Sequence, residues 1–345
     1  PPQGDIARRV GPNYIGQHNV YFASLNRNKR SVCIDLATPA GQESLGRLAT
    51  DAHALITNMR PGVIQKLGLT YQQLRKWNER LVCVALTGYG LTGPYADRPA
   101  YDYVIQALAG VMALTGDPDG PPTKAGYSLV DNSAGIMGAV GALAGIIKAE
   151  GGQVDISLYD VMLSQLNYLA AAYLNAGERA QRYRRGAHPY IVPAQIFPTR
   201  DGYLALFISH DGFWQRFAKE VQRPQWIDDP HFATMEARHV NRERVIEEVE
   251  TLLKTDTTAR WVQRLSRLGI VVAGIETLEE ALESELTRAR GMIDIIHTPD
   301  GMFRFVGNPI KWGGYASPHR PAPLLGEHSD EILGTTAAHS QTHDR

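Results

Sequence analysis

Strand-like and helix-like segments alternate regularly over the first half of this 345-residue chain, and this alternation restricts the possible folds more than any other feature. Strands separated by helices of about ten to fifteen residues favour right-handed βαβ units and a parallel sheet. We therefore predict an α/β fold built on a Rossmann-like parallel sheet. The expected strands are 30–36, 53–59, 80–88 and 154–160, the expected helices 39–51, 70–80 and 133–149, and a turn is expected at 60–68.

Near residue 200 the pattern changes to one strand followed by several charged, amphipathic helices. This change predicts a second, smaller α+β domain. We place a large α/β domain at 1–198, the small domain at 199–297, and a C-terminal segment that returns to the large domain at 298–345.

Charge and composition exclude several classes of partner. Lys and Arg number 35 against 36 Asp and Glu, which argues against binding to nucleic acid or to an anionic membrane surface. No stretch is expected to span a membrane, because the most apolar helix, 133–149, contains four glycines and reaches Lys148. Cys33 and Cys83 lie in apolar runs and are expected to be small buried residues in a reducing cytoplasm.

The hexapeptide "GYGLTG" fits the G-x-G-x-x-G pattern of dinucleotide-binding folds and follows an expected strand. In those folds Gly88, Gly90 and Gly93 would let a pyrophosphate reach the start of a helix. Pro94 and Pro99 prevent a helix from starting there, so dinucleotide binding is disfavoured. A glycine-rich ligand loop at the carboxyl edge of the sheet remains plausible.

Metal binding is also disfavoured. The more noticeable histidines have no His, Cys or carboxylate at the spacing of a zinc or non-haem iron site, so we expect no metal. These histidines are His188, His210, His319 and His328.

The segment "VDISLYD" places an acid, Asp160, where an expected strand gives way to a helix. Asp155 points away from the apolar face of that strand and is expected to be structural. Capping the helix is the default role of Asp160, but a carboxylate at a helix start on the carboxyl edge of a sheet can also attack an activated acyl group. Asp102 and Asp131 each open a helical stretch, where capping is the simplest role.

Several segments together resemble the class III CoA-transferases, the formyl-CoA, carnitine and bile-acid CoA-transferase type. The resemblance covers nearly the whole chain and implies that the first strand and helix of the family would precede Pro1. The segments are "NRNKRSVCIDLATPAG", "NMRPGVIQKLGL", "LTGYGLTGPYADRPAYDYVIQALAGVMALTGDPDGPP", "GQVDISLYD" and "RPAPLLGEHSDEIL".

The resemblance implies that CoA moves between carboxylic acids through an aspartate, with Asp160 as the nucleophile. Asp160 would attack the donor acyl-CoA to give a mixed anhydride and CoA thiolate. The thiolate would return to form an aspartyl-CoA thioester, which the acceptor carboxylate attacks. Asp102 would be a second carboxylate that orients or polarises Asp160, and the pocket must exclude water.

The resemblance also carries over contacts to CoA, the expected substrate. Arg60, Lys66 and Arg98 suit the anionic 3′-phospho-ADP, although each would otherwise be taken as a solvated surface charge. A basic residue common in the family is replaced by Ala37. The expected CoA contacts are Ile34, Asp35, Leu36, Asn58, Met59, Arg60, Lys66, Arg98, Ala100 and Tyr101.

Related α-methylacyl-CoA racemases carry a histidine at the position of Tyr101, so the tyrosine favours transfer over racemisation. The tetraglycine lid of formyl-CoA transferases has no counterpart, and the loop 182–197 is expected to shape the acyl pocket, with Arg185 and His188 as candidate contacts to a carboxylate. The resemblance implies an interlocked homodimer.

Three alternatives stay open at this point. They are a racemase or isomerase, a dinucleotide-dependent oxidoreductase, and a catalytically silent CoA-binding homologue. The acyl donor and acceptor are not determined.

Overall fold

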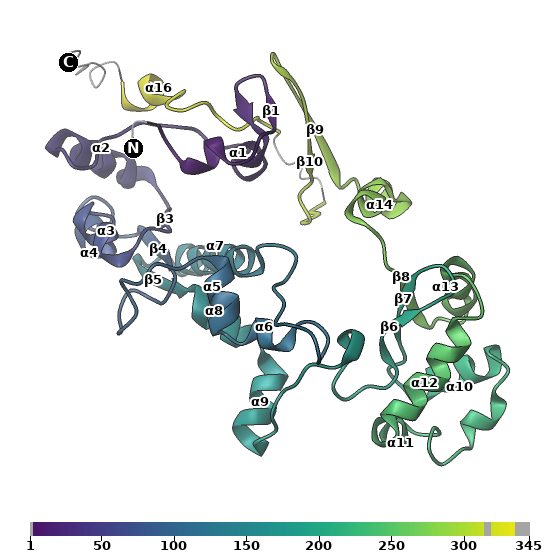
Figure 1. The fold of residues 1–345 in the computed structure, drawn as a ribbon. Coiled ribbons are helices and arrows are strands. Elements are labelled where there is room, and N and C mark those ends of the chain that lie inside the picture. Colours follow the sequence, from purple (N-terminus) through teal and green to yellow (C-terminus); the bar gives the residue numbers. More distant parts are fainter. Residues whose placement is uncertain (1–2, 314–318, 335–345) are drawn as a thin grey trace. The chain divides into compact units, whose positions relative to one another are not determined.

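The computed structural model describes residues 3–313 and 319–334. The chain divides into two compact units (Figure 1). Residues 49–275 form one unit, and the two ends of the chain, 1–48 and 276–345, together form the other.

A three-stranded parallel sheet in the unit 49–275 confirms the predicted α/β class. Its order is β3-β4-β5, and Val82–Ala85 of the central strand β4 are almost completely buried. The strands are β3 (Ala54–Thr57), β4 (Val82–Thr87) and β5 (Gly152–Ser157). The helices that connect and follow them are α3 (Pro61–Lys66), α4 (Tyr71–Leu74), α5 (Asp102–Leu108), α6 (Val111–Leu114), α7 (Leu129–Lys148), α8 (Leu158–Gln165) and α9 (Asn167–Ala176).

The segment expected to be a turn, 60–68, contains the short helix α3 instead. Pro61 stands at the first helical position, where its fixed φ is already suited to a helix and its missing N–H costs no hydrogen bond.

The glycines of α7 allow this helix to lie close against the sheet. Gly138, Gly141 and Gly145 follow one another on one face. A Cβ at Gly141 would come within 2.9 Å of Val154, and one at Gly145 within 2.6 Å of Val82. The glycines therefore allow the helix to pack closely on the sheet, although glycine inside a helix lowers the stability of the helix.

Only one face of α7 is buried. Its buried residues are Val130, Ala134, Gly138 and Ala142, while Ile136, Val140, Leu143 and Ile147 are exposed in the chain. Among the described residues, this 20-residue helix alone has the length and the apolar composition that could cross a membrane. Core helices of soluble proteins have the same length and composition.

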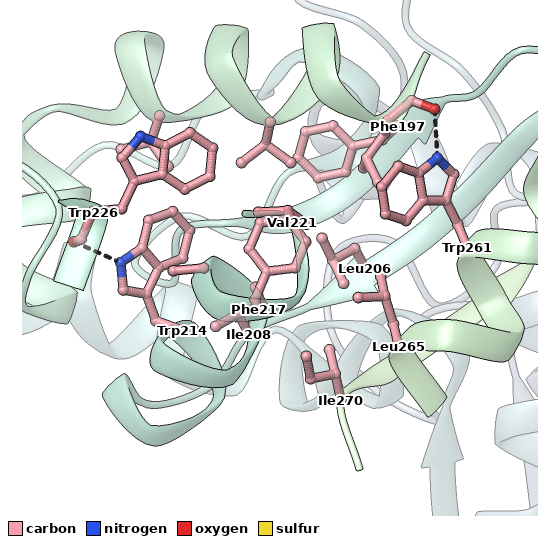
Figure 2. Packing of buried hydrophobic residues seen from close by; sticks show 14 of the residues in the cluster. Phe197, Leu206, Ile208, Trp214, Phe217, Val221, Trp226, Trp261, Leu265 and Ile270 are labelled. Carbon is pink, nitrogen blue, oxygen red and sulfur yellow. Dashed lines mark hydrogen bonds between the residues drawn. The ribbon is translucent and has the colours of Figure 1, made fainter. Parts of the chain in front are cut away.

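An antiparallel sheet, β6-β7-β8, lies in the same unit with a group of helices and carries the largest apolar core (Figure 2). Trp214 stacks on Trp226 with ring centroids 5.4 Å apart, and the Trp214 indole N–H donates to the Trp226 carbonyl at 3.2 Å. These elements are β6 (Ala194–Pro198), β7 (Tyr203–Phe207), α10 (Asp211–Glu220), α11 (Met235–Val240), α12 (Arg242–Leu253), α13 (Thr258–Arg267) and β8 (Val271–Gly274).

Arg238 is a fully buried arginine at the border of this core. Its guanidinium donates to the carbonyls of Val192 at 3.0 Å and Phe232 at 2.8 Å, and pairs with Asp211 at 2.8 Å. Burial lowers the pKa of Arg238, and the Asp211 carboxylate raises it in part. The arginine thus joins segments that are far apart in the sequence.

The unit made of the chain ends contains a second, smaller apolar core. A β9–β10 hairpin contributes Ile296, Phe303 and Phe305, which pack with Phe22. Its described elements are β1 (Tyr14–Ile15), β2 (His18–Asn19), α1 (Val20–Leu25), α14 (Leu278–Glu283), α15 (Glu285–Ala289), β9 (Ile293–Thr298), β10 (Gly301–Val306) and α16 (Ser329–Leu333). Helix α2 (Pro39–Asp51), as predicted, lies at the end of the first segment of this unit and continues into the unit 49–275.

The prediction of a strand at 30–36 is wrong, because this segment has no regular secondary structure and belongs to no sheet. Its backbone groups bond to the C-terminal segment instead. The Ser31 N–H donates to His328 Nδ1 at 3.3 Å, and the Cys33 N–H donates to Ser329 Oγ at 3.1 Å. Cys33 is also exposed rather than buried, whereas Cys83 is buried as expected.

We expect Arg238→Met to lower the free energy of unfolding by about 2–4 kcal/mol, because it leaves the buried carbonyls of Val192 and Phe232 without their donors. Urea unfolding measures the loss. The exposed Arg267→Met serves as the control and should change little; equal stability of the two variants would contradict the role given to Arg238.

Candidate active site

The carboxyl edge of the parallel sheet gathers several predicted site residues. β4 and β5 pair with Thr87 opposite Ser157, so the segments that follow both strands begin side by side. The Tyr159 N–H donates to the Gly88 carbonyl at 3.2 Å, which joins the glycine loop 88–93 to the start of α8. This edge is where α/β sheets bind ligands.

The glycine loop is fixed by side chains of the strands below it. Thr87 Oγ1 accepts the Gly90 N–H at 2.9 Å, and Asp155 Oδ2 accepts the Leu91 N–H at 2.9 Å. Asp155 is thus a structural residue, as expected. No helix starts between the glycine loop and α5, which agrees with the argument from the prolines against dinucleotide binding.

Because Gly88 has no side chain, Ala100 can lie close to it at this edge of the sheet. A Cβ at Gly88 would overlap the Cβ of Ala100. Ala100 and Tyr101 directly precede α5, and the Tyr101 side chain is 78% exposed.

Asp160 lies in the first turn of α8, three residues after the end of β5. Ser157 is the N-cap, and its Oγ accepts the Asp160 N–H at 3.2 Å. The expectation that Asp160 ends the strand and caps the helix is therefore wrong. Its carboxylate is exposed and makes no hydrogen bond or ion pair with any residue that the structure describes.

Asp102 is the first residue of α5 and is only 7% exposed. Its Oδ1 accepts from Gln106 Nε2 at 2.7 Å, and its Oδ2 accepts from the Val130 N–H at 2.7 Å and the Asp131 N–H at 3.4 Å. Asp102 thus caps α7 from another helix, since Ser128, the residue at the N-cap of α7, makes no side-chain cap. Its contacts do not include Asp160.

Asp131, expected only to cap a helix, lies in the first turn of α7, two turns before Gly138, which faces Leu86 near the carboxyl end of β4. The opposite end of α7 faces Val82 at the start of β4, so α7 begins at the carboxyl edge of the sheet. Asp131 therefore lies toward the edge at which Asp160 also lies.

The surroundings of Asp131 differ from those of Asp160. Burial raises the pKa of Asp131, the charge of Asp102 raises it further, and Lys124 lowers it in part. Lys124 Nζ lies 3.9 Å from Asp102 Oδ1. Asp131 is therefore an exposed carboxylate beside a second carboxylate, at a helix N-terminus that favours negative charge.

The expected CoA contacts fall into both units. Arg60 is the N-cap residue of α3 and Lys66 is its last residue, so both follow β3. Both side chains are exposed and make no ion pair among the described residues. Asn58 and Met59, also exposed, precede them. Since β3 is parallel to β4, these residues lie toward the same edge of the sheet.

Arg98 stacks over the Tyr95 ring at 3.9 Å in the segment that follows the glycine loop. Ile34, Asp35 and Leu36 belong to the unit formed by the chain ends. There Asp35 accepts the Ala37 N–H at 3.0 Å and makes a turn that leads into α2.

Arg185 and His188 already have partners. Arg185 makes a short ion pair with Glu250 through its guanidinium. His188 Nδ1 accepts from the N–H groups of Tyr190 and Ile191, both at 3.1 Å. Burial lowers the pKa of His188 and the charge of Arg242 lowers it further, so the ring is neutral at pH 7.

A hollow of about 480 Å³ lies beside His188, lined by the Tyr168, Ile196 and Phe207 side chains among others. In the part of the chain that the structure describes, no group of three or more His, Cys, Asp or Glu side chains could hold a metal ion.

The family model described as CoA-transferase family III matches residues 1–329, and the chain therefore belongs to this family. Acetyl-CoA:oxalate CoA-transferase of Acetobacter aceti is 32% identical over 345 residues, covering 98% of this chain and 87% of the relative. Succinate–glutarate CoA-transferase of Agrobacterium fabrum is 34% identical over 350 residues, covering 96% and 86%.

Solved structures agree. A CAIB/BAIF family protein from Brucella suis superposes with a TM-score of 0.81 at 31% identity, covering 96% of this chain and 89% of that one. Rv3272 from M. tuberculosis superposes with a TM-score of 0.84 at 28% identity, with the same coverage. The chain is thus an acyl-CoA:carboxylate CoA-transferase of class III, a family that uses CoA thioesters as substrates.

We expect Gly88→Ala to cost about 1–3 kcal/mol of stability and to lower transferase activity, because the new methyl group must push Ala100 away from the edge of the sheet. Chemical unfolding and steady-state rates measure both effects. Gly152→Ala, where a Cβ meets nothing within 4 Å, is the matched control. A Gly88→Ala variant that equals this control in both measurements would show that the close approach is unimportant.

We expect Asp131→Asn to be more stable than the wild type at neutral pH. The raised pKa means that the native state binds this proton more tightly than the unfolded state, so ionised Asp131 costs stability above that pKa. The gain in stability should fade as the pH drops and vanish below about pH 4, where Asp131 of the wild type is as neutral as the asparagine of the variant. Thermal melts of the wild type and the variant at several pH values measure this gain, and equal melting temperatures at neutral pH would contradict it.

Proposed function

We propose that the chain moves CoA from an acyl-CoA donor to a carboxylic acid acceptor through a covalent aspartyl intermediate, with Asp160 as the nucleophile and Asp102 as the second carboxylate. The observation that supports this choice is the position of Asp160 in the first turn of α8, directly after β5 ends at the carboxyl edge of the sheet. Asp131 is a competing assignment, because it too lies in the first turn of a helix that begins at this edge.

Contacts separate the two carboxylates. The Asp160 carboxylate is exposed and makes no hydrogen bond or ion pair with the described residues, so it is free to attack an acyl group. Asp131 is exposed as well, and the nearby charge of Asp102 disfavours its ionised form, which is the form that attacks. The mixed anhydride and the aspartyl thioester are both destroyed by water, so the bound substrates must shield the reacting carboxylate.

The proposed reaction conserves the energy of the thioester. Asp160 attacks the acyl carbonyl, and CoA leaves as a thiolate. The thiolate then attacks the aspartyl carbonyl of the anhydride, which releases the donor acid and leaves an aspartyl-CoA thioester. The acceptor carboxylate attacks this thioester, and the returning thiolate takes the acceptor acyl group and frees Asp160.

For CoA binding we propose Arg60, Lys66 and Arg98 as contacts to the phosphates. The side chains of Arg60 and Lys66 are exposed and have no ion pair among the described residues, so binding breaks no existing bridge. The remaining predicted contacts, Ile34, Asp35, Leu36, Asn58, Met59, Ala100 and Tyr101, stay part of this proposal.

For the acceptor we propose a small dicarboxylate, in line with the relatives named for oxalate, succinate and glutarate. His188 is the better of the two candidate contacts, because Arg185 is held by Glu250. With Nδ1 accepting backbone N–H groups, a neutral His188 carries its proton on Nε2 and can donate it to a carboxylate.

We further propose a cytoplasmic, interlocked homodimer. The exposed apolar side chains of α7, Ile136, Val140, Leu143 and Ile147, support an interface on this helix.

The decisive experiment mixes the protein with a panel of acyl-CoAs, traps the intermediate with hydroxylamine or borohydride, and measures intact mass. We expect the wild type and Asp131→Asn to be modified and Asp160→Asn to remain unmodified, with peptide mapping placing the label on Asp160. A label that is lost only in Asp131→Asn would give the role to Asp131.

If no donor labels the protein while CoA still binds, the racemase or the silent homologue is favoured. Racemisation of a 2-methylacyl-CoA, followed by chiral analysis of the product, then separates these two.

A further inference from the structure

Two buried hydroxyl groups lie side by side at the carboxyl edge of the parallel sheet, and the proposed chemistry uses neither of them. Thr87 ends β4 and Ser157 ends β5, and the register of the two strands pairs them. Only 4% of the surface of Thr87 and 3% of that of Ser157 are exposed. A buried hydroxyl costs free energy unless it is hydrogen-bonded, so valine or alanine would fill these positions more cheaply.

The Ser157 hydroxyl fixes the backbone of Asp160. Ser157 is the N-cap residue of α8, and its Oγ accepts the Asp160 N–H at 3.2 Å. The Asp160 carboxylate makes no hydrogen bond or ion pair with the described residues, so its place depends on the backbone of this first helical turn. The Ser157 hydroxyl therefore contributes to where the carboxylate lies.

The Thr87 hydroxyl fixes the glycine loop at its sharpest bend. Thr87 Oγ1 accepts the Gly90 N–H at 2.9 Å, and Asp155 Oδ2 accepts the next N–H, that of Leu91, also at 2.9 Å. Gly90 has a φ of 93°, a conformation that residues with a side chain rarely adopt. Without the hydroxyl, the buried Gly90 N–H would lose its acceptor, and the bend would lose one of its two supports.

A third hydrogen bond joins the two fixed segments. The Tyr159 N–H donates to the Gly88 carbonyl at 3.2 Å, so the loop 88–91 and the turn 157–160 are held to each other as well as to the neighbouring ends of β4 and β5. The rate of attack on a bound acyl group depends steeply on geometry, since a displacement of about 1 Å can lower it by about a hundredfold. Both hydroxyls thus act on the distance between the loop and Asp160.

We propose that Ser157 and Thr87 are positioning residues for CoA transfer: Ser157 sets the place of Asp160, and Thr87 sets the glycine loop against which the acyl-CoA lies. This inference rests on the proposed function, with Asp160 as the nucleophile. Each hydroxyl acts through a backbone N–H, that of Asp160 or that of Gly90.

The test for Ser157 compares Ser157→Ala, which removes the hydroxyl, with Ser157→Thr, which keeps it. For Ser157→Ala we expect kcat to fall by about tenfold or more, with the KM for acyl-CoA within about twofold of the wild type, because attack rather than binding is affected. Trapping of the label on Asp160 should slow by the same factor. Ser157→Thr, whose hydroxyl can also cap a helix, should keep kcat within about threefold.

The test for Thr87 compares the isosteric Thr87→Val with Thr87→Ser. For Thr87→Val we expect the KM for acyl-CoA to rise by about fivefold or more, because the glycine loop loses its bond at Gly90. Thr87→Ser should keep KM within about twofold of the wild type, since its Oγ can accept the same N–H.

Thr257→Ala is the matched control for the loss of a helix cap. Thr257 Oγ1 accepts the Arg260 N–H at 3.3 Å at the start of α13, a helix that carries none of the proposed site residues. This variant should lower the melting temperature about as much as Ser157→Ala does, and leave kcat and KM unchanged. Ser157→Gly is a second variant for Ser157, because glycine removes the hydroxyl with little loss of helix stability.

A wild-type kcat in Ser157→Ala and Ser157→Gly would overturn the inference, as would a loss of kcat that Ser157→Thr shares, a loss of the same size in Thr257→Ala, or an unchanged KM in Thr87→Val. Failure of both Ser157→Ala and Ser157→Gly to fold would overturn it too, because Ser157 would then serve folding. These outcomes are read only where trapping labels Asp160 in the wild type. A wild type that is not labelled there contradicts the proposed function itself, which keeps the two failures apart.

Discussion

The packing of α7 on β4 and β5 is the contact on which the candidate site depends. Gly138 faces Leu86 and Gly145 faces Val82, so helix and strand lie close together and run in opposite directions. Close packing therefore brings the start of α7 to the edge where β4 and β5 end. A larger side chain on this face would move the helix away from the sheet, and with it the acid that the helix carries.

At that edge, one buried carboxylate has two functions. Asp102 replaces the missing side-chain cap of α7, and its charge also influences the titration of Asp131. The charge of Asp102 makes Asp131 harder to ionise. Lys124 moderates this effect, since it lies near Asp102 and lowers the pKa of Asp131.

The regular part of the fold could be predicted from the sequence because strand and helix periodicities are local. The parallel sheet and α2 are found where the pattern placed them, and Pro94 and Pro99 correctly indicated that no helix follows the glycine loop. The segment 30–36 was misassigned because an apolar run does not reveal whether a partner strand is present. The capping of α7 by Asp102 was not predicted because it depends on contacts between α5 and α7 that no local pattern encodes.

The bonds between the segment 31–33 and residues 326–329 have a consequence for biosynthesis. Cys33 bonds to Ser329, which lies 296 residues later in the sequence. Contacts so distant in sequence form late and slowly, because a long loop must close before they contribute. The unit 49–275 can complete its own sheets during synthesis, whereas the unit formed by residues 1–48 and 276–345 must wait until residues 326–329 have been synthesised.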